Sequence, residues 1–159
     1  MKSWCTPKST REFLRRLKNV LTLYAQPFDP GRPTVCFDEQ NVQLLADIRP
    51  GRPMRPGQIR RQDYDAKRVR HGTRNIFMFL EPKAGLRHVL ITCRRAKVDW
   101  AKAIRYLVDV LHPLAALIDL VYDNLNTHVP NTLIEIFGKV EADRLLARLV
   151  LHPTPVHAS

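Results

Sequence analysis

The sequence has no long apolar run, few cysteines and far fewer acidic than basic residues. Its longest apolar stretch, Leu114 to Tyr122, is short and contains an aspartate, so no membrane span is expected. The N-terminus lacks the apolar core of a signal peptide. Cys5, Cys36 and Cys93 are widely spaced, which excludes a CxxC metal pair and a disulfide framework. We therefore expect a protein of a reducing, cytoplasmic compartment.

The scarcity of acids gives the chain a formal net charge of +11, from 26 Lys+Arg against 15 Asp+Glu. An excess of this size favours a polyanionic partner, either nucleic acid or an acidic membrane surface. The alternative is a basic protein with no such partner. A length of 159 residues suits one domain, and an apolar content of 45% argues against disorder.

Apolar periodicity and breakers predict the order of elements along the chain. We expect a first helix from the Ser9–Glu12 capping box to Tyr24, and a break at 27–33. The later elements are a strand over 34–37, a basic insert over 49–74, strands over 75–80 and 86–92, a helix over 98–111, a strand over 117–122, helices over 130–137 and 141–149, and a last strand over 150–152. Three strands followed by alternating helices and strands is the order of an RNase H-like domain, an α/β fold with a mixed five-stranded sheet flanked by helices. We divide the chain into a linker helix, 1–30, and that domain, 31–159.

The insert Arg49 to Arg74 carries nine Lys or Arg and only two acids. We expect an exposed irregular or hairpin segment that contacts nucleic-acid phosphates. The candidate contact residues are Arg60, Arg61, Lys67, Arg68, Arg70 and Arg74. Tyr64 is the only aromatic residue in the insert, so stacking on bases is a poor second explanation. A solvated charged loop is the alternative.

Two of the expected strands end in an aspartate, Asp38 after TVCF and Asp123 after LIDLVY. Ligands of open α/β sheets gather beyond the carboxyl ends of the strands. If these strands are parallel neighbours, the two carboxylates meet and need a cation, and Mg²⁺ prefers such hard oxygen ligands. An aspartate at a strand end is more often a turn-former or a helix cap, so this pair alone is weak.

The residues around the pair resemble bacterial insertion-sequence transposases of the mariner-related superfamily, the insertion sequence six-thirty group. The segments that carry the resemblance are Val35-Cys-Phe-Asp-Glu39, Tyr122-Asp-Asn-Leu-Asn-Thr-His128 and Thr154-Pro-Val-His-Ala-Ser159. Further matches are Trp4-Cys-Thr-Pro7, the stretch from Tyr24 to Pro33, Asn75-Ile-Phe-Met-Phe-Leu-Glu-Pro82 and Arg87-His-Val89. The similarity runs from about Ser3 to the last residue in the family's order.

The resemblance implies an RNase H-like DDE endonuclease that cleaves and transfers DNA strands with Mg²⁺ or Mn²⁺. Asp38 would be its first catalytic, metal-binding carboxylate and Asp123 its second. Asn124 and His128 would support the metal site or the DNA; for His128, a turn or helix-start residue is the alternative. The implied partners are transposon ends and target DNA, and a homodimer and association with a full-length transposase both stay open. The implied location is the cytoplasm, at the nucleoid.

The chain departs from the family in two places. The family continues with a Trp-Leu-Asn segment and a last catalytic helix bearing the third acid, and this chain lacks both. It also lacks the N-terminal helix-turn-helix region. We therefore expect truncation before the third acid and impaired or absent catalysis. The rival hypotheses are a non-catalytic basic DNA-binding remnant or transposition inhibitor, and a cellular RNase H-like RNA nuclease.

Three further residues or pairs are weaker candidates for a site. His152 and His157 have a poor spacing for zinc, since they are five residues apart around two prolines. Cys36 lies inside an apolar run and is expected in the core rather than as a nucleophile. Glu39 is a poor substitute for the third acid. It follows Asp38 directly, so on a continuing strand its side chain would face the opposite side of the sheet.

Overall fold

The structure, a computed structural model, describes residues 10–46, 51–60, 69–123 and 130–155. Five strands form one sheet in the order β3-β2-β1-β4-β5. They are β1 Thr34–Ala46, β2 Val69–Glu81, β3 Leu86–Thr92, β4 Ile118–Tyr122 and β5 Leu149–Pro153. The β1–β2 and β2–β3 pairs are antiparallel, whereas β4 is parallel to both β1 and β5. The mixed five-stranded sheet expected from the sequence is therefore confirmed.

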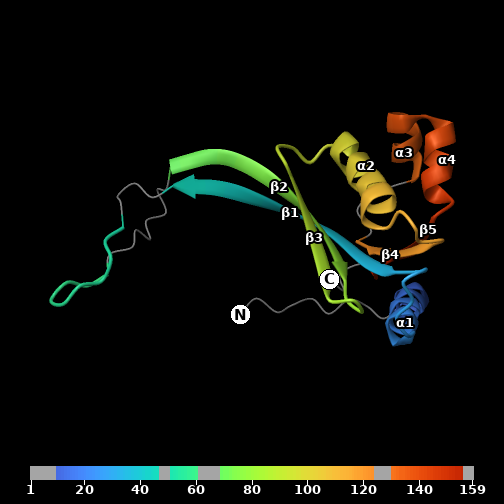
Figure 1. The fold of residues 1–159 in the computed structure, drawn as a ribbon, viewed down its shortest axis with the longest axis horizontal. Helices are drawn as coiled ribbons and strands as arrows, with labels where there is room; N and C mark the ends of the chain where they lie inside the picture. Colours follow the sequence, from blue (N-terminus) through green and yellow to red (C-terminus); the bar gives the residue numbers. More distant parts are fainter. Residues whose placement is uncertain (1–9, 47–50, 61–68, 124–129, 156–159) are drawn as a thin grey trace.

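Helices lie on both sides of this sheet (Figure 1). One side, here called the helical face, is covered by α2 Lys97–Tyr106, the π-helical turn η1 Leu107–Leu111, α3 Pro130–Phe137 and α4 Lys139–Leu146. Alternate residues of β1 and β2 point to this face, among them Val35, Phe37, Phe77 and Phe79, and they form the main core with the helices. Burial of these side chains supplies the main force that holds the two layers together.

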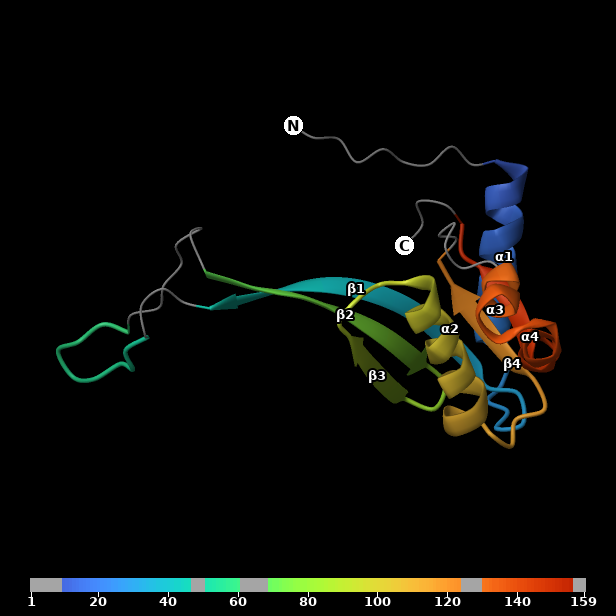
Figure 2. The same ribbon diagram turned by 90° about the horizontal axis from the view of Figure 1, so that it is seen from above.

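The opposite side of the sheet, here called the α1 face, carries helix α1 Arg11–Ala25 (Figure 2). Val20 and Leu23 of α1 pack there against Val121 of β4, with Cys36 of β1 at the edge of the cluster. The predicted core location of Cys36 is therefore supported, although its side chain is only partly buried. In the described part of the chain, no helix is long and apolar enough to cross a membrane.

Strands β1 and β2 are longer than predicted. β1 continues past Asp38 to Ala46, and β2 begins at Val69, inside the predicted insert. Their distal halves pair with each other and extend beyond the helices as a two-stranded arm (Figure 1). The register shifts between Gln43 and Leu45, opposite Gly72, whose φ of +89° suits glycine. Of the rest of the insert, residues 51–60 are described and include one isolated bridge, Arg55 with Gln58.

Other helix and strand boundaries differ from the predictions by a few residues, except for α3 and β3, which match them. The N-cap of α1 is Thr10, whose hydroxyl accepts the Phe13 N–H at 3.1 Å. Glu12, expected to complete a capping box, pairs instead with Arg15 and Arg16. The predicted helix over 98–111 is α2 followed by η1, where the His112 N–H reaches back to the Leu107 carbonyl at 3.1 Å.

Candidate metal site at the edge of the sheet

Asp38 and Asp123 come directly after the last residues that pair β1 with its parallel neighbour β4. Phe37 of β1 is in register with Tyr122 of β4, so Asp38 and Asp123 are the next residues along the two strand directions. Adjacent strands lie about 4.8 Å apart, which brings the two carboxylates to one edge of the sheet. Asp38 is exposed and Asp123 is half-buried, so a solvated cation can reach both.

Asp38 and Glu39 point to opposite sides of β1. Asp38 lies on the α1 face with Cys36, whereas Glu39 follows the direction of Phe37 on the helical face. The Glu39 side chain is 2% exposed, and its Oε1 lies 2.6 Å from Nε of Arg95. The expected opposite orientation of Glu39 therefore holds. The Glu39 backbone N–H donates to Oδ1 of Asp38 at 2.7 Å.

The pKa of Glu39 reports on the charge around this edge. Burial raises the pKa of the Glu39 carboxyl, Arg95 opposes that rise, and the negative charges of Asp38 and Asp123 add to it. Three carboxylates are thus close enough to affect one another, and the Glu39 carboxylate is paired with Arg95. A cation bound between Asp38 and Asp123 would relieve this repulsion.

Arg16 of α1 brings positive charge close to the same edge. Its Nη1 lies 3.5 Å from the carbonyl of Thr154, and the Thr154 N–H donates to the Tyr122 carbonyl at 2.9 Å. Burial raises the pKa of Tyr122, and the charge of Arg16 opposes that rise. Nε of Arg16 is also held 2.7 Å from Glu12. No sequence pattern indicated Arg16, because its position depends on how α1 crosses the sheet.

The other predicted site residues are divided between the described and the remaining parts of the chain. Asn124 and His128 lie outside the described residues, as do Arg61, Lys67 and Arg68. Arg60 is exposed in the described segment 51–60, and Arg70 and Arg74 belong to β2. Arg74 pairs across from Val42 and Arg70 across from Leu45, so both lie on the two-stranded arm.

His152 has a structural partner. Its Nε2 lies 2.8 Å from Oδ1 of the buried Asp119, and its Nδ1 lies 3.0 Å from the side-chain amide of Asn19 in α1. Arg32 completes the network with two hydrogen bonds to Asp119, at 2.7 and 2.9 Å. Both ring nitrogens of His152 thus have protein partners, and His157 lies outside the described residues. Within those residues, no group of three His, Cys, Asp or Glu side chains could hold a metal ion.

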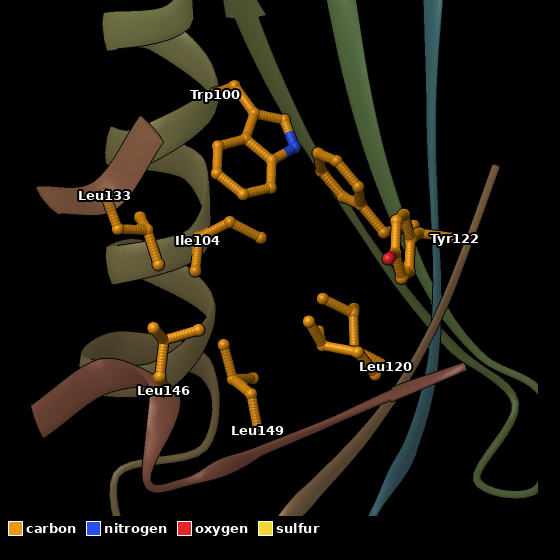
Figure 3. A pocket seen from close by; sticks show the side chains of 9 residues that line it. Trp100, Ile104, Leu120, Tyr122, Leu133, Leu146 and Leu149 are labelled. Carbon is orange, nitrogen blue, oxygen red and sulfur yellow. The ribbon is translucent and has the colours of Figure 1, made fainter. Parts of the chain in front are cut away.

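An apolar pocket lies between the sheet and the helices (Figure 3). Its lining includes Trp100, Ile104, Leu133 and Leu146 from the helices and Leu120 from β4. The cavity volume is about 10 Å³, at the lower limit for one water molecule. This void is therefore a small packing defect in the core, on the face of the sheet opposite Asp38.

The fold has counterparts among solved structures. One is the crystal structure of the Mos1 mariner paired end complex with Mn, at 14% identity and a TM-score of 0.53, covering 98% of this chain and 46% of that one. Another is a pre-cleavage Mos1 transpososome, at 12% identity and a TM-score of 0.53, covering 99% of this chain and 47% of that one. This chain thus spans slightly under half the length of these structures. No protein-family model matches the chain, and no curated protein matches it. The structural likeness shows the fold: a mixed five-stranded sheet flanked by helices, of the RNase H-like kind found in the Mos1 transposase structures.

Proposed function

We propose that this chain is the catalytic-domain portion of a mariner-related DNA transposase, of the insertion sequence six-thirty group. The intact protein would cleave DNA strands and join the freed 3′ ends to target DNA with divalent metal ions. The observation that carries the proposal is the position of Asp38 and Asp123, side by side at the carboxyl edge of parallel strands in an RNase H-like sheet. Open α/β sheets bind their ligands at this edge.

The donor atoms of this edge suit Mg²⁺ or Mn²⁺. Both side chains offer hard carboxylate oxygens, and both are accessible to water. When bound, such ions would stabilise charge on a phosphodiester and activate the attacking oxygen. The protein's own part is to hold Asp38 and Asp123 on rigid strands and to place Arg16 where it can contact a DNA phosphate. Asn124 and His128 remain supporting residues in this proposal.

We further propose that this chain is catalytically impaired, because two aspartates balance only two of the four charges of a metal pair. Glu39 faces away from the edge and is held by Arg95, so it cannot serve as the third ligand without a rearrangement of β1. Incubation with supercoiled plasmid and Mg²⁺ or Mn²⁺ should give little nicking above the Asp38→Asn control. Robust nicking that this substitution abolishes would contradict the impairment and leave the metal site standing.

A non-catalytic DNA-binding remnant, able to inhibit a full-length transposase, is the second candidate. The two-stranded arm (Figure 1) favours it. Arg70 and Arg74 belong to β2 on the arm, and the exposed Arg60 lies in the segment that connects its two strands in the sequence. Contacts to phosphates release counterions, so DNA affinity should fall steeply with salt. Arg60→Ala/Arg61→Ala should lower that slope, and an unchanged slope would remove this segment as the contact surface.

The partners and the location follow from the same proposal. We propose transposon ends and target DNA as partners, together with a homodimer or a complex with full-length transposase, in the cytoplasm at the nucleoid. The linker helix 1–30 would lead into the catalytic domain 31–159. An RNase H-like RNA nuclease is the competing enzyme class, and cleavage confined to RNA–DNA hybrids would favour it.

Fe²⁺-directed cleavage of the polypeptide tests the proposed metal site without requiring DNA cleavage. Fe²⁺ that replaces Mg²⁺ generates hydroxyl radicals with ascorbate and peroxide, and these cut the chain close to the ion. We expect fragments ending near residues 38 and 123, which excess Mg²⁺ suppresses and Asp38→Asn removes. Fragments from other positions, or cuts insensitive to Mg²⁺, would refute the proposed function.

A further inference from the structure

We propose that Arg95 and Glu39 act as positioning residues that fix the carboxylate of Asp38 for divalent-metal binding. The inference rests on the proposed function and adds to it a support on the far side of the sheet. It comes from one continuous series of contacts: Arg95 to the Glu39 side chain, and the Glu39 backbone to Asp38.

The first step is the direct contact to Asp38. Its Oδ1 accepts the Glu39 N–H at 2.7 Å. This bond ties the orientation of the carboxylate to the peptide plane between residues 38 and 39. A rotation of that plane would change the orientation of the Asp38 carboxylate relative to Asp123, the residue that follows β4.

The second step is the ion pair between Glu39 and Arg95, which holds that peptide plane. The Glu39 side chain is 2% exposed, and its Oε1 lies 2.6 Å from Nε of Arg95. A buried carboxylate is costly unless a cation accompanies it, so the charge of Arg95 favours this position of the Glu39 side chain. Beyond Tyr122, β4 no longer pairs with β1, so at residue 39 the sheet restrains β1 through β2 alone. The ion pair therefore restrains β1 at a point where only one neighbouring strand pairs with it.

The third step is the anchoring of Arg95 itself. Arg95 lies in the short connection between β3 and α2. The Thr92 hydroxyl donates to the Arg94 carbonyl at 2.6 Å, on one side of Arg95. On the other side, the Ala96 N–H donates to Asp99 in the first turn of α2 at 3.2 Å. The connection thus presents the guanidinium from a backbone that is fixed on both sides.

A positioning role and a purely electrostatic role of Arg95 predict opposite effects of its removal on cation binding. Removal of a positive charge close to two aspartates would strengthen cation binding if charge alone mattered. If Arg95 positions Asp38, its removal weakens cation binding instead, and supporting residues of metal sites typically contribute about 10–100-fold in affinity. Glu39→Gln weakens binding under either account, so Arg95 is the discriminating position.

The test is the Mn²⁺ affinity of the whole chain, measured by calorimetry or by the electron paramagnetic resonance of free Mn²⁺. The variants are Arg95→Met, Arg95→Lys and, as a matched control, the neighbouring exposed Arg94→Met. We expect a loss of about tenfold or more for Arg95→Met, partial recovery with lysine, and no loss for Arg94→Met. Circular dichroism and thermal melting establish that each variant is folded; if Arg95→Met is not, Arg95→Lys and Arg95→Gln carry the comparison.

Each outcome has one meaning. Mn²⁺ affinity in Arg95→Met that is unchanged or tighter than in the parent overturns the positioning role and leaves the metal site intact. A parent chain that does not bind Mn²⁺ through Asp38 and Asp123 refutes the proposed function itself. A loss of affinity shared equally by Arg94→Met would also overturn the inference, since it would reflect general charge or stability.

Discussion

At the scale of single residues, Asp119 shows how an acid can be buried within an apolar strand. Its side chain is 2% exposed and accepts hydrogen bonds from Arg32, and Oδ1 lies 2.8 Å from His152. Burial alone would raise the pKa of Asp119, but the contacts with Arg32 and His152 outweigh burial and hold the pKa below its ordinary value. The sequence around it, LIDLVY, predicted the strand correctly and gave no sign of these partners.

Asp119→Asn should lower the free energy of unfolding at pH 7 by about 1–3 kcal/mol, since charged hydrogen bonds are lost from a buried site. Because the pKa of Asp119 is depressed in the folded state, its stabilising contribution is present above its ordinary pKa. That contribution disappears as the pH falls through the folded value. Urea unfolding at pH 7 and pH 3 tests this, and an equal difference between parent and variant at both pH values would contradict it.

Glu81 shows the opposite shift, because its pKa is raised in the folded state. Burial raises the pKa of its carboxyl, although His88 opposes the rise, and Oε2 lies 3.9 Å from Nε2 of His112. Its contribution to stability is therefore present below its ordinary pKa and lost as the pH rises through the folded value. Glu81→Gln should raise the melting temperature more at pH 8 than at pH 4. A larger gain at pH 4 would show that the charged carboxylate is stabilised in the folded state.

At the scale of elements, Arg148 closes the end of η1. It donates to the carbonyls of Val108, His112, Pro113 and Ala115 at 2.6 to 3.3 Å. Carbonyl groups at a helix C-terminus lack partners within the helix, and a cation there also interacts well with the helix dipole. One side chain thus fixes the passage from α2 and η1 into β4, the strand that precedes Asp123.

Arg148→Met should cost about 2–3 kcal/mol of unfolding free energy, because several carbonyls lose a charged donor together. Arg144→Met is the control, since the Arg144 side chain is 44% exposed and its ion pairs with Asp109 and Glu141 lie at the surface. Exposed pairs of this kind contribute about 1 kcal/mol or less. Chemical denaturation of both variants measures the difference, and equal losses would argue against the proposed role of Arg148.

The sequence predicted several short elements closely. α3 and β3 match their predicted bounds, and β4 differs by one residue. β4 is an apolar run buried on both faces, whereas β3 is largely exposed and was indicated by its β-prone residues and the short turn before it. The distal halves of β1 and β2 were missed because none of their side chains is fully buried, and the β2 half, VRHGTR, shows no apolar alternation. In β1, the half-buried Val42, Leu44 and Ala46 alternate with exposed residues, a period of two that could have indicated the longer strand.

At the scale of the whole molecule, the core and the candidate metal site lie in different parts of the sheet. Its helical face holds the core with α2, α3 and α4 (Figure 2), whereas Asp38 is exposed and Asp123 is half-buried at the end of β4. The two aspartates could be singled out from the sequence because strand ends and the family resemblance both mark them. Arg16 and Arg95 could not be singled out in this way, because no local sequence pattern marks them. Each lies on a segment that only the fold brings near β1 or β4.

The proposed function depends most on a shared cation at Asp38 and Asp123. Calorimetric titration of the parent with Mn²⁺ tests it directly, beside Asp38→Asn, Asp123→Asn and the exposed Asp143→Asn of α4 as a control of equal charge change. We expect one specific site in the parent, retained in Asp143→Asn and weakened at least about tenfold by either of the other substitutions. Equal Mn²⁺ affinity in all four proteins would contradict the account.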